Sequence, residues 1–192
     1  MTKTRIEAFS DGVFAIAITL LVLDLHADLS VIHQWPAYAA FVFGFLTIGV
    51  MWVNHHHLMH QFGHVDRVLL FLNLLLLMGI VFIPFPTALI AERIRGGDAR
   101  AATLAYGCTG IFLAIFFNAL WHYGAQGRRL LRADARVREI SGITRSYLPG
   151  VPLYLTGTLL SFASPVASAC VYAAIAVFYA VSNTFFGKEP SG

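Results

Sequence analysis

The sequence predicts an all-α integral membrane protein with six transmembrane helices in a single domain, residues 1–192. Two observations come from composition: 58% of the residues are hydrophobic and only 12% are charged, against ~25% charged residues in a typical soluble domain. The third observation is that apolar residues form runs close to the ~20 residues that a helix needs to cross a bilayer. A chain of 192 residues leaves no room for a separate soluble domain beside six such helices.

The first four helices follow directly from these runs. Residues 5–25 begin with charged residues and continue as the apolar run "AIAITLLVL". Residues 36–58 and 68–90 are apolar and are separated by the short polar link "HQFGHVDR". Residues 101–123 form the next run, after the link "AERIRGGDAR". Each run is therefore predicted to cross the bilayer once.

The last two helices are predicted from one long apolar block, residues 147–186, which follows a basic stretch at 127–145. Ser164 and Pro165 divide this block, and a residue that precedes proline disfavours the helical conformation. The block is therefore predicted to be a hairpin of two spans. One span followed by a re-entrant piece is the alternative.

The distribution of arginine and lysine predicts how the six helices are oriented. With an even number of spans, both termini lie on one side of the membrane, together with the second and fourth links. That side carries ten of the thirteen basic residues, whereas the other side carries only Arg93, Arg95 and Arg100. Because cytoplasmic loops concentrate positive charge, both termini are predicted to be cytoplasmic. The net charge of +3 is explained by these loops and does not indicate nucleic-acid binding.

One face of the first helix is predicted to be a continuous apolar stripe. Ile16, Leu20 and Leu23 recur at i, i+4 and i+7, and therefore lie on the same side of a helix. Phe9 extends this stripe toward the cytoplasm, and Thr19 borders it. Apolar side chains on a membrane helix usually face lipid or neighbouring helices, so the spacing alone leaves the function open.

Ser10 and Asp11 point away from the apolar stripe. An ionised carboxylate in the hydrocarbon costs ~2.5–3.5 kcal/mol even on insertion scales, so Asp11 is expected to contact protein rather than lipid. Polar side chains at a comparable depth are its candidate partners: Trp52, His55, His56 and Asn73. These residues predict a buried polar network that fixes the first helix to its own subunit. Alternatively, Asp11 lies at the membrane interface, where it favours the helix dipole.

Three motifs in the first half of the chain carry a family resemblance. They are "R-x-x-x-F-S-D-G-V-F-A-I-A-I-T-L-L-V-L" on the first helix, "W-V-N-H-H-H-L-M" on the second and "P-F-P-T" near the end of the third. Together they closely resemble the transmembrane-175 potassium channel family, which comprises the lysosomal potassium channel and shorter prokaryotic relatives. The last three helices match that family in number and hydropathy.

The resemblance implies a potassium-selective or potassium-preferring channel in the inner (plasma) membrane of a prokaryote. It implies a homotetramer in which four first helices line a central pore that conducts K⁺, with no cofactor and no enzymatic activity. The sequence lacks the "TVGYG" loop of common potassium filters. By position after "FSD", the resemblance instead assigns the pore constriction to Ile16, Leu20 and Leu23, with Thr19 as a threonine layer. These residues coincide with the stripe predicted from helical spacing.

The resemblance implies structural roles for the residues of the charged opening: Arg5, Phe9, Ser10 and Asp11. They are expected to hold the first helix so that its stripe faces the pore axis. Asp24 follows Leu23 in the sequence and is a candidate for attracting cations at the outer mouth. A solvated carboxylate at the end of a helix is the alternative for Asp24.

The histidine-rich segment "HHHLMHQFGH" has two interpretations. His56, His60 and His64 recur at i, i+4 and i+8, and helical histidines at such spacings can bind zinc or nickel. Because no acidic or cysteine ligand lies nearby in the sequence, hydrogen bonding by His55 and His56 is favoured and no metal site is predicted. His57, His60 and His64 are expected at the cytoplasmic interface, where titration near neutral pH would allow a pH-sensitive gate.

Two other functional classes remain as alternatives. A secondary cation transporter tends to show inverted repeats and broken helices with charges near the midplane, and the sequence shows neither clearly. An intramembrane enzyme needs a nucleophile and a base, or a metal pair, at membrane depth. Only the "FSD" and "HH" residues are grouped in this way. Cys108 and Cys170 lie inside apolar runs and are interpreted as buried small hydrophobes rather than as a redox pair.

Overall fold

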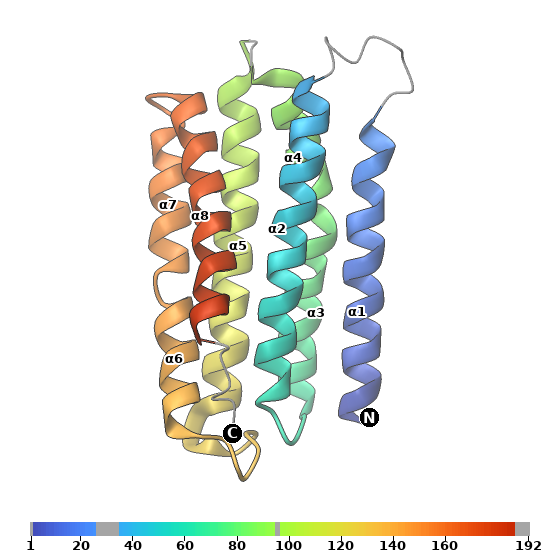
Figure 1. Ribbon diagram of the computed structural model, residues 1–192, viewed down its shortest axis with the longest axis vertical. Coiled ribbons are helices and arrows are strands. Elements are labelled where there is room, and N and C mark those ends of the chain that lie inside the picture. Colours follow the sequence, from blue (N-terminus) through green and yellow to red (C-terminus); the bar gives the residue numbers. More distant parts are fainter. Residues whose placement is uncertain (1, 26–34, 95–96, 187–192) are drawn as a thin grey trace.

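The apolar runs form long helices that lie side by side (Figure 1). The computed structural model describes residues 2–25, 35–94 and 97–186, without the side chains of Asp24 and residues 182–186. The described residues form α1 (Lys3–Leu20), η1 (Leu21–Asp24), α2 (Trp35–His60), α3 (Arg67–Phe82), α4 (Pro84–Arg93), α5 (Ala99–Ala125), η2 (Gln126–Arg128), α6 (Val137–Tyr147), α7 (Gly150–Leu160) and α8 (Pro165–Phe186). The elements η1 and η2 are short 3₁₀ helices.

Nine of these elements build six rods, because three of the rods consist of two helical pieces each, and η2 follows the end of α5. α1 continues into η1, α3 into α4, and α6 into α7 (Figure 1). α4 begins at Pro84, whose missing N–H ends the hydrogen-bond ladder of α3. By length and hydropathy, the rods containing α1, α2, α3–α4 and α5 can each cross a membrane. The α6–α7 rod and α8 complete the six, so the prediction of an all-α, six-helix membrane protein is confirmed.

The fifth rod begins earlier than predicted. Residues 137–147, assigned from the sequence to a basic link, form α6. Ile140, Ile143 and Tyr147 recur every three to four residues and give α6 an apolar face that packs against the main core. The predicted start of the closing helices was therefore wrong.

The turn between the last two rods lies where it was predicted. α8 begins at Pro165, and the Ser164 hydroxyl accepts a hydrogen bond from the Ala167 N–H at 3.2 Å. α8 is continuous over 22 residues, which does not support the alternative of a re-entrant piece. Cys108 and Cys170 were expected to be buried, but both are exposed on the subunit surface.

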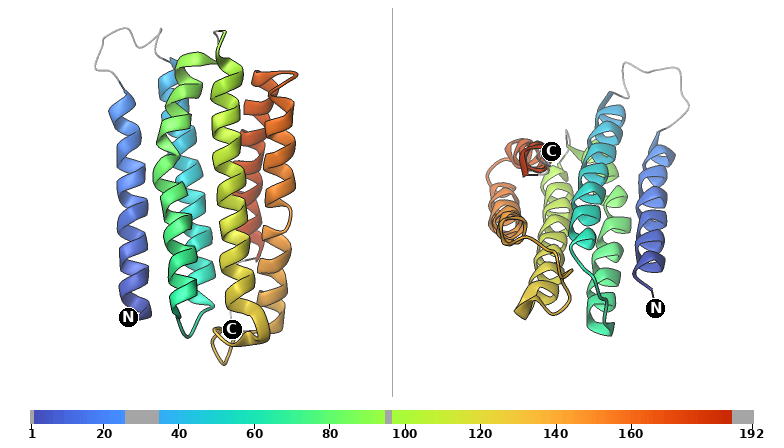
Figure 2. Two further views of the ribbon diagram at one scale, coloured as in Figure 1. Left: turned by 180° about the vertical axis from the view of Figure 1, so that it is seen from behind. Right: turned by 60° about the horizontal axis from the view of Figure 1, so that its bottom comes forward.

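The order of the rods places α1 at one edge of the bundle, beside α2 and α3 (Figure 2). α5 lies near the middle, and α7 and α8 cover its other side. Glycines allow α5 and α7 to approach closely: a Cβ on Gly110 would overlap the ring of Tyr154, and one on Gly107 would overlap the Thr158 hydroxyl. The edge position leaves much of α1 without a neighbour inside the subunit.

Two links at the end of the bundle where α1 begins are joined by their backbones. The Gly63 N–H donates to the Leu130 carbonyl, and the Arg132 N–H donates to the Gln61 carbonyl, both at 2.9 Å. These bonds flank an isolated bridge between Phe62 and Leu131. The α2–α3 link and the η2–α6 link therefore form one connected layer beneath the helices.

Asp66 reinforces the same layer by capping α3. Its carboxylate accepts hydrogen bonds from the Leu69 N–H at 2.8 Å and from the Tyr123 hydroxyl at 2.6 Å. Burial alone would raise the pKa of the Asp66 carboxyl, but these bonds and the nearby Arg129 charge outweigh it and hold the pKa below its usual value. The cap therefore contributes stability only while the Asp66 carboxyl is ionised.

Candidate functional site

α1 buries one face and exposes the other. The buried face consists of Ile6, Ser10, Phe14 and Ala17, which recur every three to four residues and contact the main core. Beyond the C-terminal end of α1, Leu21 of η1 fits against Gly44 of α2, where an added Cβ would lie 2.9 Å from the leucine methyl group. This packing sets the rotation of α1 about its axis and therefore determines which residues face outward.

A three-residue hydrogen-bonded chain joins α1, α3 and α2 inside the subunit. The Asn73 amide donates to the Ser10 hydroxyl at 3.0 Å, and its oxygen lies 2.7 Å from His55 Nε2. All three side chains are at most 2% exposed. Asn73 thus links the first helix to the second by using both ends of its amide group, as the predicted polar network requires.

Asp11 has a separate partner on α2. The Trp52 indole N–H donates to the Asp11 carboxylate at 2.8 Å. This pair lies at the subunit surface, since Asp11 is exposed and Trp52 is 40% exposed. Asp11 therefore contacts protein as predicted. It lies on the exposed surface of α1 and is not part of the buried hydrogen-bonded chain of Ser10, Asn73 and His55.

His56 does not join this network in the described part of the chain. Its side chain is exposed, and its ring lies 6.0 Å from the ring of Trp52, measured between centroids. His55 and His56 are adjacent residues of one helix and therefore point about 100° apart. The hydrogen-bonded network therefore includes His55 but not His56.

Sequence reasoning missed two residues that position α1. The ring of Phe14 lies 5.3 Å from the ring of His55, between centroids, and is 1% exposed. Its spacing of four residues from Ser10 places it on the same buried face and would have identified it. The second missed residue is Gly44, whose role depends on the close approach of η1 to α2 and has no signal in sequence spacing.

The predicted stripe lies on the exposed side of α1. Four large apolar residues project from α1 and its continuation η1 with exposed fractions of 36% to 74%: Phe9, Ile16, Leu20 and Leu23. Arg5 and Gly12 are exposed on the same side of α1, at spacings of three to four residues from Phe9. The stripe thus runs along the whole helix, and none of its residues belongs to the buried core of the chain.

Thr19 borders the stripe, and its hydroxyl group already donates a hydrogen bond within the helix. The Thr19 hydroxyl donates to the Ile16 carbonyl at 2.8 Å, and the side chain is exposed. The oxygen keeps lone pairs that can accept hydrogen bonds or contact a cation. The side chain of Asp24 lies outside the described residues, so its predicted position at the pore mouth stays a prediction.

The other histidines do not form the helical array that the spacing predicted. α2 ends at His60, so His64 lies in the following link and does not continue the helical spacing. His60 instead lies 3.2 Å from a guanidinium nitrogen of Arg132. Within residues 2–25, 35–94 and 97–186, no three histidine, cysteine or acidic side chains are grouped as a metal site would require.

Comparisons with known proteins match nearly the whole chain. The family model described as "Endosomal/lysosomal potassium channel TMEM175" matches residues 5–84. A protein named as a potassium channel from Chamaesiphon minutus is 44% identical over 192 residues, which covers 93% of this chain and 94% of that protein. Another, from Streptomyces collinus, is 41% identical over 187 residues, which covers 91% of this chain and 90% of that protein.

A solved structure agrees with these sequence matches. The crystal structure of a lysosomal potassium-selective channel TMEM175 homologue from Chamaesiphon minutus superposes with a TM-score of 0.85 at 41% identity. The match covers 94% of this chain and 98% of that one. The two sequence relatives and this structure extend the resemblance well beyond the first-helix signature. The chain is therefore a prokaryotic member of the TMEM175 family.

Proposed function

We propose that this protein is a potassium-preferring cation channel, assembled from four copies whose α1 helices line a central pore. The observation that carries the proposal is the exposed apolar stripe of α1. The polar chain through Ser10, Asn73 and His55 holds the opposite face of the helix against its own subunit. The names of the related proteins, potassium channels that match nearly the whole chain, support this function.

In the proposed tetramer, Ile16, Leu20 and Leu23 form successive apolar rings around the pore axis. A narrow apolar neck expels water and stops ion flow, and it conducts when the helices move apart. Thr19 adds a ring of hydroxyl oxygens beside this neck, because each hydroxyl proton is donated to the Ile16 carbonyl. These oxygens present lone pairs that stabilise a partly dehydrated cation.

We place both termini on the cytoplasmic side of a prokaryotic plasma membrane. The described residues support this orientation, because the end of the bundle where α1 begins carries the basic links that follow α2 and α5. The opposite end carries Arg93 and Arg100 among the described residues. Positive charge in loops favours the cytoplasm, so the end with more arginines faces inward.

A secondary transporter fits the structure less well than a channel. A cavity of about 40 Å³ lies between α2, α5, the α6–α7 rod and α8, and its lining residues include Asn54, Asn118 and Tyr147 but no charged side chain. Transporters bind their coupling ions at sites near the midplane, within a subunit. This cavity lacks a charged side chain that would hold such an ion. A channel whose pore lies between α1 helices of different copies does not require an ion site inside one chain.

The test is ion flux through liposomes containing wild-type protein, Ile16→Asn or Leu20→Ala, with K⁺, Na⁺ and H⁺ gradients in separate arms. Ile16→Asn is expected to wet the neck and raise flux, and both variants are expected to weaken the preference for K⁺ over Na⁺. Val22→Asn is the matched control, because Val22 is 50% exposed, close to the 59% of Ile16, but lies off the stripe.

Three results would contradict the proposal. Unchanged flux and selectivity in both stripe variants would remove α1 as the pore wall. A flux that saturates and requires a second ion would indicate a transporter. A current carried by H⁺ with no K⁺ component would replace potassium as the permeant ion.

A further inference from the structure

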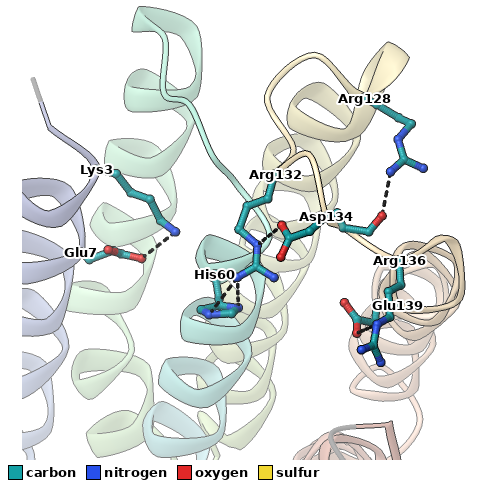
Figure 3. Close-up of polar contacts among 9 residues, drawn as sticks. Lys3, Glu7, His60, Arg128, Arg132, Asp134, Arg136 and Glu139 are labelled. Atoms are coloured by element: carbon teal, nitrogen blue, oxygen red, sulfur yellow. Dashed lines mark hydrogen bonds and ion pairs between the residues drawn. The ribbon is translucent and has the colours of Figure 1, made fainter. Parts of the chain in front are cut away.

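Six arginines gather between the end of α5 and the end of α6, and four of them are already paired. Figure 3 shows three of these contacts, and the fourth joins Arg129 to the carboxylate of Asp66 at 3.7 Å. The three drawn contacts are Arg128 with the Ala135 carbonyl at 2.7 Å, Arg132 with Asp134 at 3.2 Å and Arg136 with Glu139 at 4.0 Å. Three of these contacts lie in the layer of links beneath the bundle, and the contact of Arg136 with Glu139 lies at the start of α6.

The remaining two arginines, Arg138 and Arg145, lie on the outer side of α6. They are seven residues apart, which is close to two turns, so both project from the same face. Both are exposed, and no acidic side chain in the described part of the chain pairs with either one. Ser141 and Gly142 lie between them and are too small to fill the space between two long side chains. α6 therefore presents two guanidinium groups that have no ion pair among the described residues and are separated on this face by small residues.

The same side of the rod becomes apolar just above this pair. Leu148 is 66% exposed and follows Arg145 by three residues. Farther along α7, Leu155 is 46% exposed and Leu159 is 59% exposed. The change from arginine to leucine within one turn marks the boundary between lipid headgroups and acyl chains.

We propose that Arg138 and Arg145 bind the phosphate headgroup of an anionic phospholipid, whose acyl chains lie along the exposed leucines of α7. The two arginines are about 10 Å apart along the helix axis, and their long side chains can converge on one headgroup. A guanidinium group binds phosphate oxygens in a bidentate manner. Glu139, the acidic residue next to Arg138, faces Arg136 instead. Two positive charges without an ion pair among the described residues therefore remain, and they favour an anionic over a zwitterionic headgroup. This proposal requires only that the chain spans a membrane.

Native mass spectrometry of the full chain in detergent tests the proposal with phosphatidylglycerol and phosphatidylcholine of identical acyl chains. Wild type is expected to retain phosphatidylglycerol preferentially. Removing both charges with Arg138→Gln and Arg145→Gln is expected to weaken its apparent affinity by about fivefold for each arginine. Arg136→Gln is the matched control, because its side chain is 71% exposed on the same helix end but faces Glu139. It is expected to leave the affinity unchanged.

Additional arms separate binding of the whole lipid from binding of phosphate alone and from loss of folding. Lysine at both positions is expected to retain most of the preference for phosphatidylglycerol, because the charges remain although the bidentate geometry is lost. Inorganic phosphate is expected not to compete, because the leucine face contributes to binding. Circular dichroism verifies that the double variant is folded. Equal retention of both lipids by wild type, undiminished phosphatidylglycerol binding by the folded double variant, or full competition by inorganic phosphate would each overturn the proposal.

Discussion

Replacing Asn73 with leucine is expected to loosen α1 from its subunit. Leucine is similar in shape to asparagine but cannot form hydrogen bonds, so the substitution removes both contacts of the amide without leaving a large cavity. The Ser10 hydroxyl can turn and bond to a carbonyl of its own helix. His55, which is 2% exposed, has no comparable substitute and is left with a buried, unpaired nitrogen.

The size of the effect follows from that unpaired histidine. A buried polar group without a partner costs ~1–3 kcal/mol, whereas hydrogen bonds between membrane helices average ~0.6 kcal/mol in double-mutant cycles. Because Asn73→Leu breaks two bonds and strands one group, we expect the free energy of unfolding to fall by about 2 kcal/mol. This is equivalent to a change of about 30-fold in the unfolding equilibrium constant.

The assay is unfolding by SDS in mixed micelles, followed by circular dichroism. Asn54→Leu is the matched control, because Asn54 is 6% exposed and its amide donates only to Val50 of its own helix, at 3.0 Å. The control is expected to lose less than about 0.5 kcal/mol, because no polar group on another helix is stranded. Equal losses in Asn73→Leu and Asn54→Leu would refute the conclusion that the three-residue chain anchors α1.

Three further predictions use the same unfolding measurement. The depressed pKa of Asp66 gives a stabilisation that is present above about pH 4 and is lost as pH falls through the folded-state pKa. Asp66→Asn should therefore be less stable than wild type at pH 7. On acidification its free energy of unfolding should fall by less than that of wild type. Gly110→Ala should destabilise the protein by ~1–3 kcal/mol through overpacking, whereas Gly49→Ala, where an added Cβ has no neighbour within 4 Å, should be neutral or stabilising. Trp52→Phe should cost ~0.6–1.7 kcal/mol, and the loss should disappear in an Asp11→Ala background, which has no carboxylate to accept the indole hydrogen bond.

Hydropathy alone was sufficient to predict most of the fold. Crossing a bilayer requires long apolar runs, and the first four rods have them. The prediction failed at α6, because its sequence "VREISGITRSY" is half polar and resembles a link by composition. Only the spacing of Ile140, Ile143 and Tyr147 reveals a helix there. A helix at the membrane boundary needs one apolar face rather than an apolar sequence.

The polar anchor was predictable in kind but not in detail. A serine, a histidine and an asparagine at similar depth in apolar helices are expected to pair, because hydrocarbon offers them no other partner. The sequence could not show that the chain uses His55 and excludes His56, because that choice depends on the rotation of α2. It also could not separate Asp11 and Trp52 from the buried chain, since exposure depends on the edge position of α1.

The hydrogen bond between Asn73 and Ser10 joins residues 63 positions apart, and this separation affects how the chain is synthesised. At 5–20 residues per second, roughly 3–13 s pass between the addition of the serine and that of its partner. During that interval the first helix can already occupy the membrane, while the Ser10 hydroxyl does not yet have its hydrogen bond from Asn73 of the third helix. Until the third helix arrives, the first helix has its contacts with the second, such as the hydrogen bond from Trp52 to Asp11, but lacks the buried hydrogen bond from Asn73.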